Sequence, residues 1–388
     1  SRKFIEMKID EALTQDLAAF PITANFQRTD QEGFGKLETI KARFLVGCDG
    51  GRSQVRKNMG IKLEGDSANK AWGVMDLLLN TDFPDIRVKS FIQSKEHGAV
   101  MTIPREGGYL CRFYVEMDTI EKETRSKEIR VTEKDLIKKA QKIFHPYELD
   151  VKEVAWWSIY SVGQRLADRF DDRSEGSADD IMPRAFVAGD ACHTHSPKGG
   201  WGLNTSLPDT FNLGWKLAAV IQKRSDFKLL ATYGTERRKV AQQLINADKE
   251  LSKLVATRPS ARDTSEKAHV DTAKIEAFMK RQSGFVSGTS IEYLPSYICT
   301  GHDNQYLAKG LMIGQRFFSA EVIRLCDGRN QHLGHLVKAD GRWRIFLFSG
   351  DEDPRDHKAK SYRFIDFLAH SSASPVKRYT PVGADIDA

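Results

Sequence analysis

One stretch constrains the fold more than any other: "FVAGDACHTHSPKGGWGLN", which spans residues 186–204. Its short apolar beginning, ended by Gly189, predicts a buried strand. From Phe211 onward, apolar residues recur at helical spacing, which predicts a helix packed against a sheet. The Gly-rich turn between them presents backbone N–H groups and a helix N-terminus, which suit a negatively charged ligand. An ordinary Gly-rich strand-to-helix connection is the alternative interpretation of this stretch taken alone.

A second stretch has the same design. "FLVGCDGGRSQVRK", residues 44–57, gives an apolar run, a turn containing Asp49 and a basic helix start. Between the two stretches, alternating and β-branched runs from about residue 70 to 117 predict a mostly antiparallel sheet. In "VTEKDLIKKAQKIF", Thr132 stands three residues before Asp135, which predicts a capped helix. Strands and helices in this order favour an α/β or α+β fold.

Composition excludes several classes of protein. The 388 residues are enough for two or three domains, and the net charge of +6 comes from basic residues interleaved with acidic ones, which argues against nucleic-acid binding. No apolar run is long enough for a membrane span, and the first residues are too charged for a signal peptide. The five cysteines are scattered without a CxxC, so we expect no zinc site, no disulfide framework and a cytoplasmic setting.

Two local patterns give further expectations. The opening "SRKFIEMKIDEAL" predicts a helix, and "KADGRW" predicts a hairpin that turns at Asp340–Gly341. Residues from about 211 to 255 read as one long helical region.

The two strand-then-turn units, with the β-rich block between them, resemble the flavoprotein aromatic hydroxylases, which are single-component FAD monooxygenases. The units are similar to that family's DG and GD motifs. The phenol 2-monooxygenase branch is most similar, through "AWGVMDLLLNTDFPDIR", "IPREGGYLCRFYVEM" and the C-terminal "GQRFFSAEVIRLCDG". The resemblance covers nearly the whole chain from about Ala42. It implies a partial FAD-binding domain at 1–70 and 165–255, a β-rich substrate domain at 71–164, a connecting segment at 256–296 and a thioredoxin-like domain at 297–388.

The resemblance also assigns roles. Asp190 would accept a hydrogen bond from a ribityl hydroxyl of FAD, and backbone N–H groups around Asn204 would face the flavin's pyrimidine edge, where reduction places negative charge. The implied cofactor-binding residues are Asp49, Gly50, Arg52, Arg112, Gly189, Asp190, Gly199, Gly200, Gly202, Leu203 and Asn204. Structural pairing remains the alternative for Arg52.

Three residues are implied in catalysis. Pro197 would lie against the isoalloxazine ring, Arg105 would contact the flavin, and Tyr114 would hydrogen-bond the phenol oxygen. A surface arginine at a hairpin and a structural tyrosine on a strand are the alternatives from the residues alone. His193 and His195 could suggest a metal pair, but no third ligand recurs at metal spacing, so we expect no metal, and Cys192 is expected only to pack.

The implied reaction uses NADPH to reduce FAD, after which molecular oxygen forms a flavin C4a-hydroperoxide that hydroxylates a small phenolic or related aromatic substrate. No nucleic-acid or membrane partner is expected, and a homodimer is possible. Two alternatives stay open: a flavin-free descendant that catalyses an isomerisation or cyclisation, and a non-catalytic homologue.

The sequence departs from the family pattern in two respects. The family's GxGxxG unit lies well before the DG motif, whereas 48 residues precede Asp49 here and no GxGxxG occurs. We therefore expect a fold truncated at its N-terminus that binds FAD weakly or not at all. Trp201 and Pro208 stand where the family commonly has Gln, and Pro208 removes a backbone donor from the predicted helix.

Overall fold

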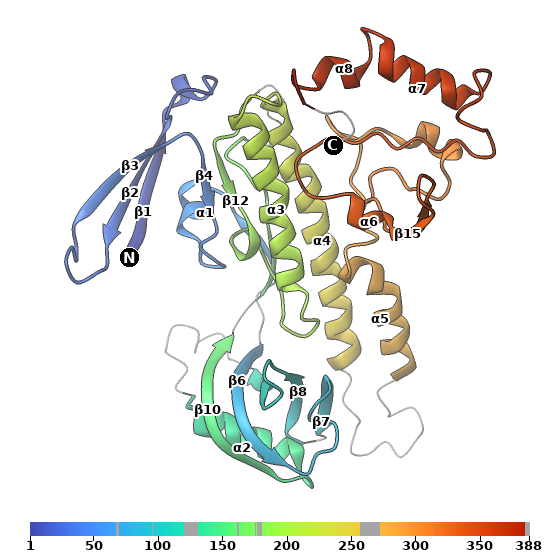
Figure 1. Ribbon diagram of the computed structural model, residues 1–388. Helices are drawn as coiled ribbons and strands as arrows, with labels where there is room; N and C mark the ends of the chain where they lie inside the picture. The colour runs from blue at the N-terminus through green and yellow to red at the C-terminus, as the bar shows by residue number, and fades with distance from the viewer. Residues whose placement is uncertain are drawn as a thin grey trace. The chain divides into compact units, whose positions relative to one another are not determined.

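The structure, a computed structural model, describes residues 1–66, 70–94, 96–119, 131–160, 163–174, 176, 181–256 and 272–384 (Figure 1). The chain forms two compact units, Ser1–Ala320 and Glu321–Ala388. The sequence-based boundaries, which begin the last domain at residue 297, stay a prediction.

The chain begins with a three-stranded antiparallel sheet and not with a helix. Its strands are β1 (Arg2–Ile9), β2 (Ile22–Arg28) and β3 (Leu37–Ala42), with the short helix η1 (Glu11–Leu13) after β1. The predicted helix was wrong because the opening residues alternate with period two: Met7 is buried while Glu6 and Lys8 are exposed. Pairing with β2, interrupted only between Phe4 and Glu6, then gives β1 backbone hydrogen bonds along one side.

The centre of the first unit is built on two short parallel strands, β4 (Leu45–Gly47) and β12 (Ala185–Val187). Around them lie α1 (Gln54–Asn58), the sheet β13–β11–β5 (His193–Thr194, Gln164–Ala167 and Leu63–Asp66) and the short helix η3 (Gly189–Ala191). The buried Tyr233 donates its hydroxyl hydrogen bond to the carbonyl oxygen of Val187, at 2.7 Å, which ties the helical layer to β12.

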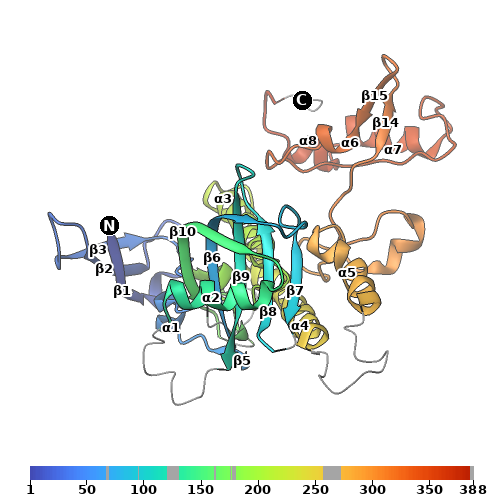
Figure 2. The same cartoon turned by 90° about the horizontal axis from the view of Figure 1, so that it is seen from below.

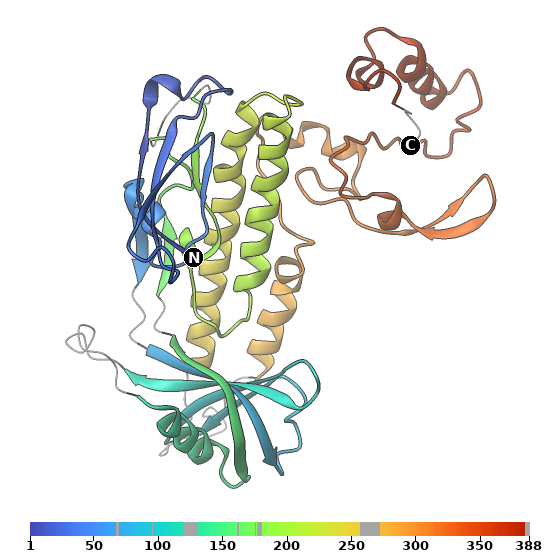
Figure 3. The same ribbon diagram turned by 60° about the vertical axis from the view of Figure 1, so that its left-hand side comes forward.

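The predicted long helical region is two helices, α3 (Gly202–Ile221) and α4 (Lys228–Ala256), which lie side by side (Figure 3). Residues 222–227 separate them, and Lys223 has a positive φ of 58° in this connection. Pro208 lies inside α3, in its second turn, without ending the helix. A third helix, α5 (Thr272–Val286), packs against α4, and η5 (His302–Leu307) follows.

Residues 70–160 form a five-stranded antiparallel sheet in the order β10–β6–β9–β8–β7, and α2 covers one of its faces (Figure 2). The strands are β6 (Lys70–Thr81), β7 (Ser90–Ser94), β8 (Gly98–Pro104), β9 (Leu110–Thr119) and β10 (Leu149–Tyr160), and α2 spans Glu133–Phe144. Thr132 and Asp135 form the predicted capping box. Alternate residues of β9, such as Phe113, pack with Leu136 and Phe144 in a core between sheet and helix.

The second unit contains the hairpin β14 (Glu321–Arg324) and β15 (Arg329–His332), with α6 (Leu333–Leu336), α7 (Lys360–His370) and α8 (Pro375–Tyr379). Its hairpin turns at Asp327–Gly328, where Gly328 has a φ of 68°. The hairpin predicted at Asp340–Gly341 was wrong, since residues 339–349 form no strand. A tight turn forms a hairpin only where both flanking runs find a cross-strand partner.

Candidate functional site

The two Gly–Asp turns meet at one place. Because β4 and β12 are adjacent and parallel, the turns that follow them leave from the same edge, the edge where ligands bind in open α/β sheets. The buried Arg56 joins them: its guanidinium donates to the carbonyl oxygens of Ala191 at 2.7 Å and Gly51 at 3.0 Å. The two turns therefore face one region.

In the first turn, Asp49 binds residues of its own turn and of the helix that follows it. Its carboxylate accepts from the backbone N–H groups of Gln54 at 2.7 Å and Val55 at 3.2 Å, and from the Ser53 hydroxyl. These bonds satisfy the free donors at the start of α1. Gly50 follows with a φ of 80°, and Arg52 is exposed.

In the second turn, Asp190 is exposed and its carboxylate makes no hydrogen bond within the described part of the chain. Gly189 before it has a φ of 62°, a conformation that favours glycine, and its N–H donates to Asp209 at 3.2 Å. Asp209 therefore holds this turn through the backbone N–H of Gly189, while the Asp190 carboxylate has no hydrogen-bond partner among the described residues.

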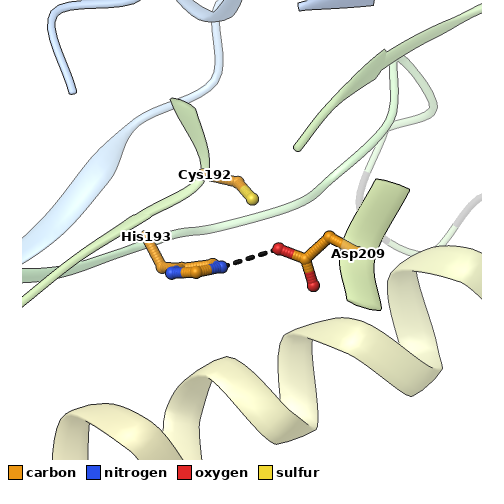
Figure 4. Close-up of side chains that lie close together, drawn as sticks. All are labelled: Cys192, His193 and Asp209. Carbon is orange, nitrogen blue, oxygen red and sulfur yellow. Dashed lines mark hydrogen bonds and ion pairs between the residues drawn. The ribbon is translucent and has the colours of Figure 1, made fainter. Parts of the chain in front are cut away.

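Asp209 belongs to a buried hydrogen-bond network that the sequence analysis did not predict. Asp209 accepts from His193 Nε2 at 2.7 Å (Figure 4). It also accepts from Arg237 Nε at 2.7 Å, and all three side chains are at most 1 % exposed. Burial alone would lower the pKa of Arg237, but the neighbouring Asp209 charge raises it. Arg237 also donates to the carbonyl oxygen of Thr205 at 3.1 Å, which ties the network to α3.

Three potential metal ligands lie close together beside the second turn. Asp209 supplies the carboxylate that the sequence did not reveal, and ligand atoms of Cys192, His193 and Asp209 lie within 4.8 Å of one another (Figure 4). However, both oxygens of Asp209 already accept hydrogen bonds, and the Arg237 cation beside them opposes a second positive charge. Burial raises the pKa of the Cys192 thiol well above its usual value, which disfavours the thiolate that a metal needs. His195 instead bonds the Ser196 carbonyl oxygen at 2.7 Å.

The N-terminus of α3 closes the second turn. Trp201 at the N-cap gives no side-chain hydrogen bond to the helix, so the first N–H groups, from Gly202 onward, have no capping side chain. A Cβ on Gly202 would lie 2.5 Å from His195 Nε2, so a larger residue there would require the His195 ring to move. Leu203, 68 % exposed, and Asn204 lie on the open side of this first turn. Pro197 precedes it, its carbonyl oxygen accepting from the Gly200 N–H at 3.1 Å.

On the five-stranded sheet, the face opposite α2 carries polar and aromatic side chains. Arg112 and Tyr114 lie two residues apart on β9, and Arg112 forms a two-point ion pair with Asp76 of β6, with both distances 2.6 Å. This pairing, with a smaller contribution from Tyr114, raises the pKa of Arg112. The guanidinium also lies 5.5 Å from the ring centre of Trp156. Arg112, which the resemblance placed on the cofactor side, is thus fixed by its own sheet.

The sheet and the second turn are in contact, since the Lys198 ammonium lies 5.8 Å from the ring centre of Trp72. Arg105 lies at the end of β8 and pairs with the adjacent Glu106 at 2.8 Å. Within the described residues, no hydrogen bond or ion pair joins Arg105 or Tyr114 to the Pro197 loop. A single cavity shared by these three residues stays a prediction.

Comparisons with known proteins agree with this architecture. Residues 10–248 match the family described as FAD binding domain, and residues 291–388 match the phenol hydroxylase C-terminal dimerisation domain. The chain is 46 % identical to 3-hydroxybenzoate 4-monooxygenase from Comamonas testosteroni, in an alignment that covers the whole of this chain and 60 % of that protein. It is 34 % identical, over 94 % of its length, to 68 % of the FAD-dependent monooxygenase hkm7 from Aspergillus hancockii.

Among solved structures, OxyS anhydrotetracycline hydroxylase from Streptomyces rimosus matches with a TM-score of 0.60 and 23 % identity, over 86 % of this chain and 58 % of that one. At this identity the likeness shows the fold, which is mixed α/β as expected. The chain spans about 60 % of the length of the first curated relatives that it matches. The motifs, the fold and these relatives together show that the chain belongs to the FAD-binding aromatic hydroxylase family.

Proposed function

We propose that this chain provides the flavin- and substrate-facing parts of an FAD-dependent monooxygenase that hydroxylates a small phenolic or related aromatic compound, with NADPH and molecular oxygen as co-substrates. One observation carries the proposal. The uncapped start of α3 and the unpaired carboxylate of Asp190 lie where β4 and β12 end, and Lys198 connects this edge to the aromatic face of the sheet.

The chain's residues fit FAD at this edge. Asp190 has free acceptor atoms for a ribityl hydroxyl. The first N–H groups of α3 need an acceptor, and the helix dipole favours negative charge at this end. The exposed Gly200 and the half-buried Gly202 carry no side chain that could cover these N–H groups, whereas Gly199 is buried against Trp201. When bound, FAD supplies the exchange of electrons with the nicotinamide and with oxygen that no side chain here provides.

The remaining assigned residues act around this group. In our proposal the backbone N–H groups of Leu203 and Asn204 stabilise negative charge on the flavin, and Pro197 borders the ring. Gly50 and Arg52 border the cofactor from the first turn, with Asp49 holding that turn in place through α1.

The sheet face supports an aromatic substrate. Trp72, Tyr114 and Trp156 lie on it by strand alternation and register. In our proposal the Tyr114 hydroxyl donates to the substrate oxygen, and the Asp76–Arg112 pair keeps the neighbouring part of β9 rigid. Because Arg112 already has a buried counter-charge, we infer that it does not serve as the binding site for an anionic substrate group.

We further propose that residues 297–388 adopt the thioredoxin-like fold of the phenol 2-monooxygenase branch and support a homodimer. The match to a dimerisation domain supports this proposal. In our proposal the protein works in a reducing, cytoplasmic setting, and its C-terminal domain, whose sequence has no CxxC, does not exchange thiols. Sedimentation of the purified chain tests the dimer, and a monomer at micromolar concentration contradicts it.

The experiment that tests the function is titration of the purified chain with FAD, followed by visible flavin absorbance and by NADPH oxidation stimulated by phenols. Tyr114→Phe is expected to lower phenol affinity by about 2- to 10-fold, as expected for one hydrogen bond. Tyr109→Phe, on the exposed turn of the same hairpin, is the matched control.

Two outcomes contradict the proposal. Equal phenol affinity and turnover in Tyr114→Phe and Tyr109→Phe would remove Tyr114 from the site. A chain that takes up no FAD and transforms an aromatic compound without oxygen would favour the flavin-free alternative.

A further inference from the structure

Asp248, on α4, is a fully buried carboxylate with no cationic partner in the described part of the chain. A buried charge without a counter-ion is costly unless hydrogen bonds replace water. Three donors do so here: the Ser196 N–H at 2.8 Å, the Ser196 hydroxyl at 2.6 Å and Gln164 Nε2 at 2.6 Å. Bonds to a carboxylate are among the stronger hydrogen bonds in proteins. The arrangement therefore concentrates strong bonds on Ser196.

The donors come from β11 and from the segment that follows β13. Gln164 begins β11, whose next residue, Arg165, pairs with Thr194 of β13. Ser196 lies two residues beyond Thr194, where the strand pairing has ended. Beyond the last backbone pair, the Asp248 side chain connects the two segments by accepting hydrogen bonds from both Gln164 and Ser196.

The residue fixed in this way is the one before Pro197. A residue before proline is restricted to extended conformations, so holding the Ser196 backbone also sets the direction of the Pro197 ring. On the other side, the Pro197 carbonyl oxygen accepts from the Gly200 N–H at 3.1 Å. Pro197 is therefore held from both neighbours while its own ring remains half-buried.

We propose that Asp248 is a positioning residue, which fixes Pro197 at the cofactor edge through its bonds to Ser196. The inference rests on the proposed function, in which Pro197 borders the flavin. Asp209 holds the other end of the same segment, at Gly189 and His193. Two buried carboxylates from the helical layer, Asp209 and Asp248, thus hold residues 189–196, and the glycine-rich stretch that follows leads from Pro197 into α3.

Hydrogen exchange of the Ser196 amide in the 388-residue chain tests this role. Asp248→Ala removes all three acceptor contacts and is expected to speed exchange by about 10- to 100-fold. Asp248→Asn keeps the side-chain shape and one acceptor oxygen but loses the charge, so a rise of about 3- to 10-fold is expected. Ser196→Ala keeps the N–H bond and should give a smaller rise than Asp248→Ala.

The matched control is Asp171→Ala, which breaks another buried carboxylate pair, with Arg173 at 3.0 Å. It should lower the melting temperature without speeding Ser196 exchange beyond its general loss of stability. Ser196 exchange in Asp248→Asn and Asp248→Ala that matches Asp171→Ala overturns the proposal. If Asp248→Ala fails to fold, Asp248→Asn decides alone.

FAD serves as a second probe. If the wild-type chain takes up FAD, Asp248→Asn is expected to change the visible flavin spectrum, whereas Asp171→Ala leaves it unchanged. An unchanged spectrum in Asp248→Asn overturns the link between Asp248 and the cofactor edge. A wild-type chain that takes up no FAD contradicts the proposed function, and Ser196 exchange then decides on Asp248 by itself.

Discussion

The two Gly–Asp turns share one sequence pattern but use it differently. In the first, the Asp49 carboxylate accepts hydrogen bonds from the backbone N–H groups at the start of α1, so the turn is stabilised by its own aspartate. In the second, Asp190 makes no bond to the described protein, and the turn is held by Asp209 and Asp248 from α3 and α4. The turn that is held from elsewhere is the one whose own carboxylate remains available to a ligand.

This difference has a physical reason. A carboxylate that caps a helix has its acceptor atoms occupied, so it offers little to a ligand without losing stability. A turn that leaves its carboxylate free needs other groups to satisfy its backbone, and these must be buried to compete with water. Separating the holding groups from the ligand-facing group is the arrangement that pre-organised sites require.

The largest expected effect comes from breaking what holds the second turn. Asp209→Asn leaves the buried Arg237 guanidinium without its counter-charge and weakens the acceptor for the Gly189 N–H. Losing one member of a buried pair costs about 3–5 kcal/mol. Urea unfolding followed by tryptophan fluorescence measures the loss. A change below about 1 kcal/mol would mean that the network does not hold the turn.

A glycine comparison sharpens the contrast. Gly50 and Gly189 have similar positive φ values, 80° and 62°, so an alanine costs about 1–2 kcal/mol at either position from backbone strain. A Cβ on Gly50 meets no atom within 4 Å, whereas one on Gly189 would lie 3.3 Å from Ser206 Cβ. Gly189→Ala should therefore lose more unfolding free energy than Gly50→Ala. Equal losses in the same urea titration would show that the second turn has room to relax.

The third prediction concerns the two aspartates as stability elements. Asp49→Ala removes a helix cap and is expected to cost about 0.5–2 kcal/mol. Asp190→Ala removes an exposed group without a bond and should change unfolding free energy by less than about 0.5 kcal/mol. Calorimetric melting of both variants beside wild type measures the difference, and an equal loss in both would erase the distinction between the turns.

The sequence could predict these turns because both consist of local signals: a short apolar run, glycines and a helix start within 20 residues. The Thr132–Asp135 capping box was equally local. The groups that hold the second turn lie on helices farther along, and helical periodicity does not say which strand end a side chain meets. One signal was present: Asp209, Asn212 and Lys216 occupy buried positions of α3 at the spacing of its apolar face. Polar residues on an inward face must have buried partners.

The errors have the same origin. The opening strand and the hairpin at Asp340–Gly341 were judged from short runs, and both depend on whether a partner strand is available. Pairing is a tertiary property that a single run of residues does not contain.

The smallest expected change is also the one that decides what the second turn is for. Asp190→Ala should leave folding intact but weaken FAD binding by about 2- to 10-fold, the effect of one hydrogen bond to a hydroxyl. Asp190→Asn keeps an acceptor oxygen and should retain most of the affinity, while Asp49→Ala at the first turn should act chiefly on stability. FAD fluorescence titration at a temperature well below each variant's melting point separates affinity from folding. If Asp49→Ala loses more FAD affinity than Asp190→Ala at equal fractions folded, the roles of the two aspartates are reversed, and Asp49 is the one that binds the cofactor.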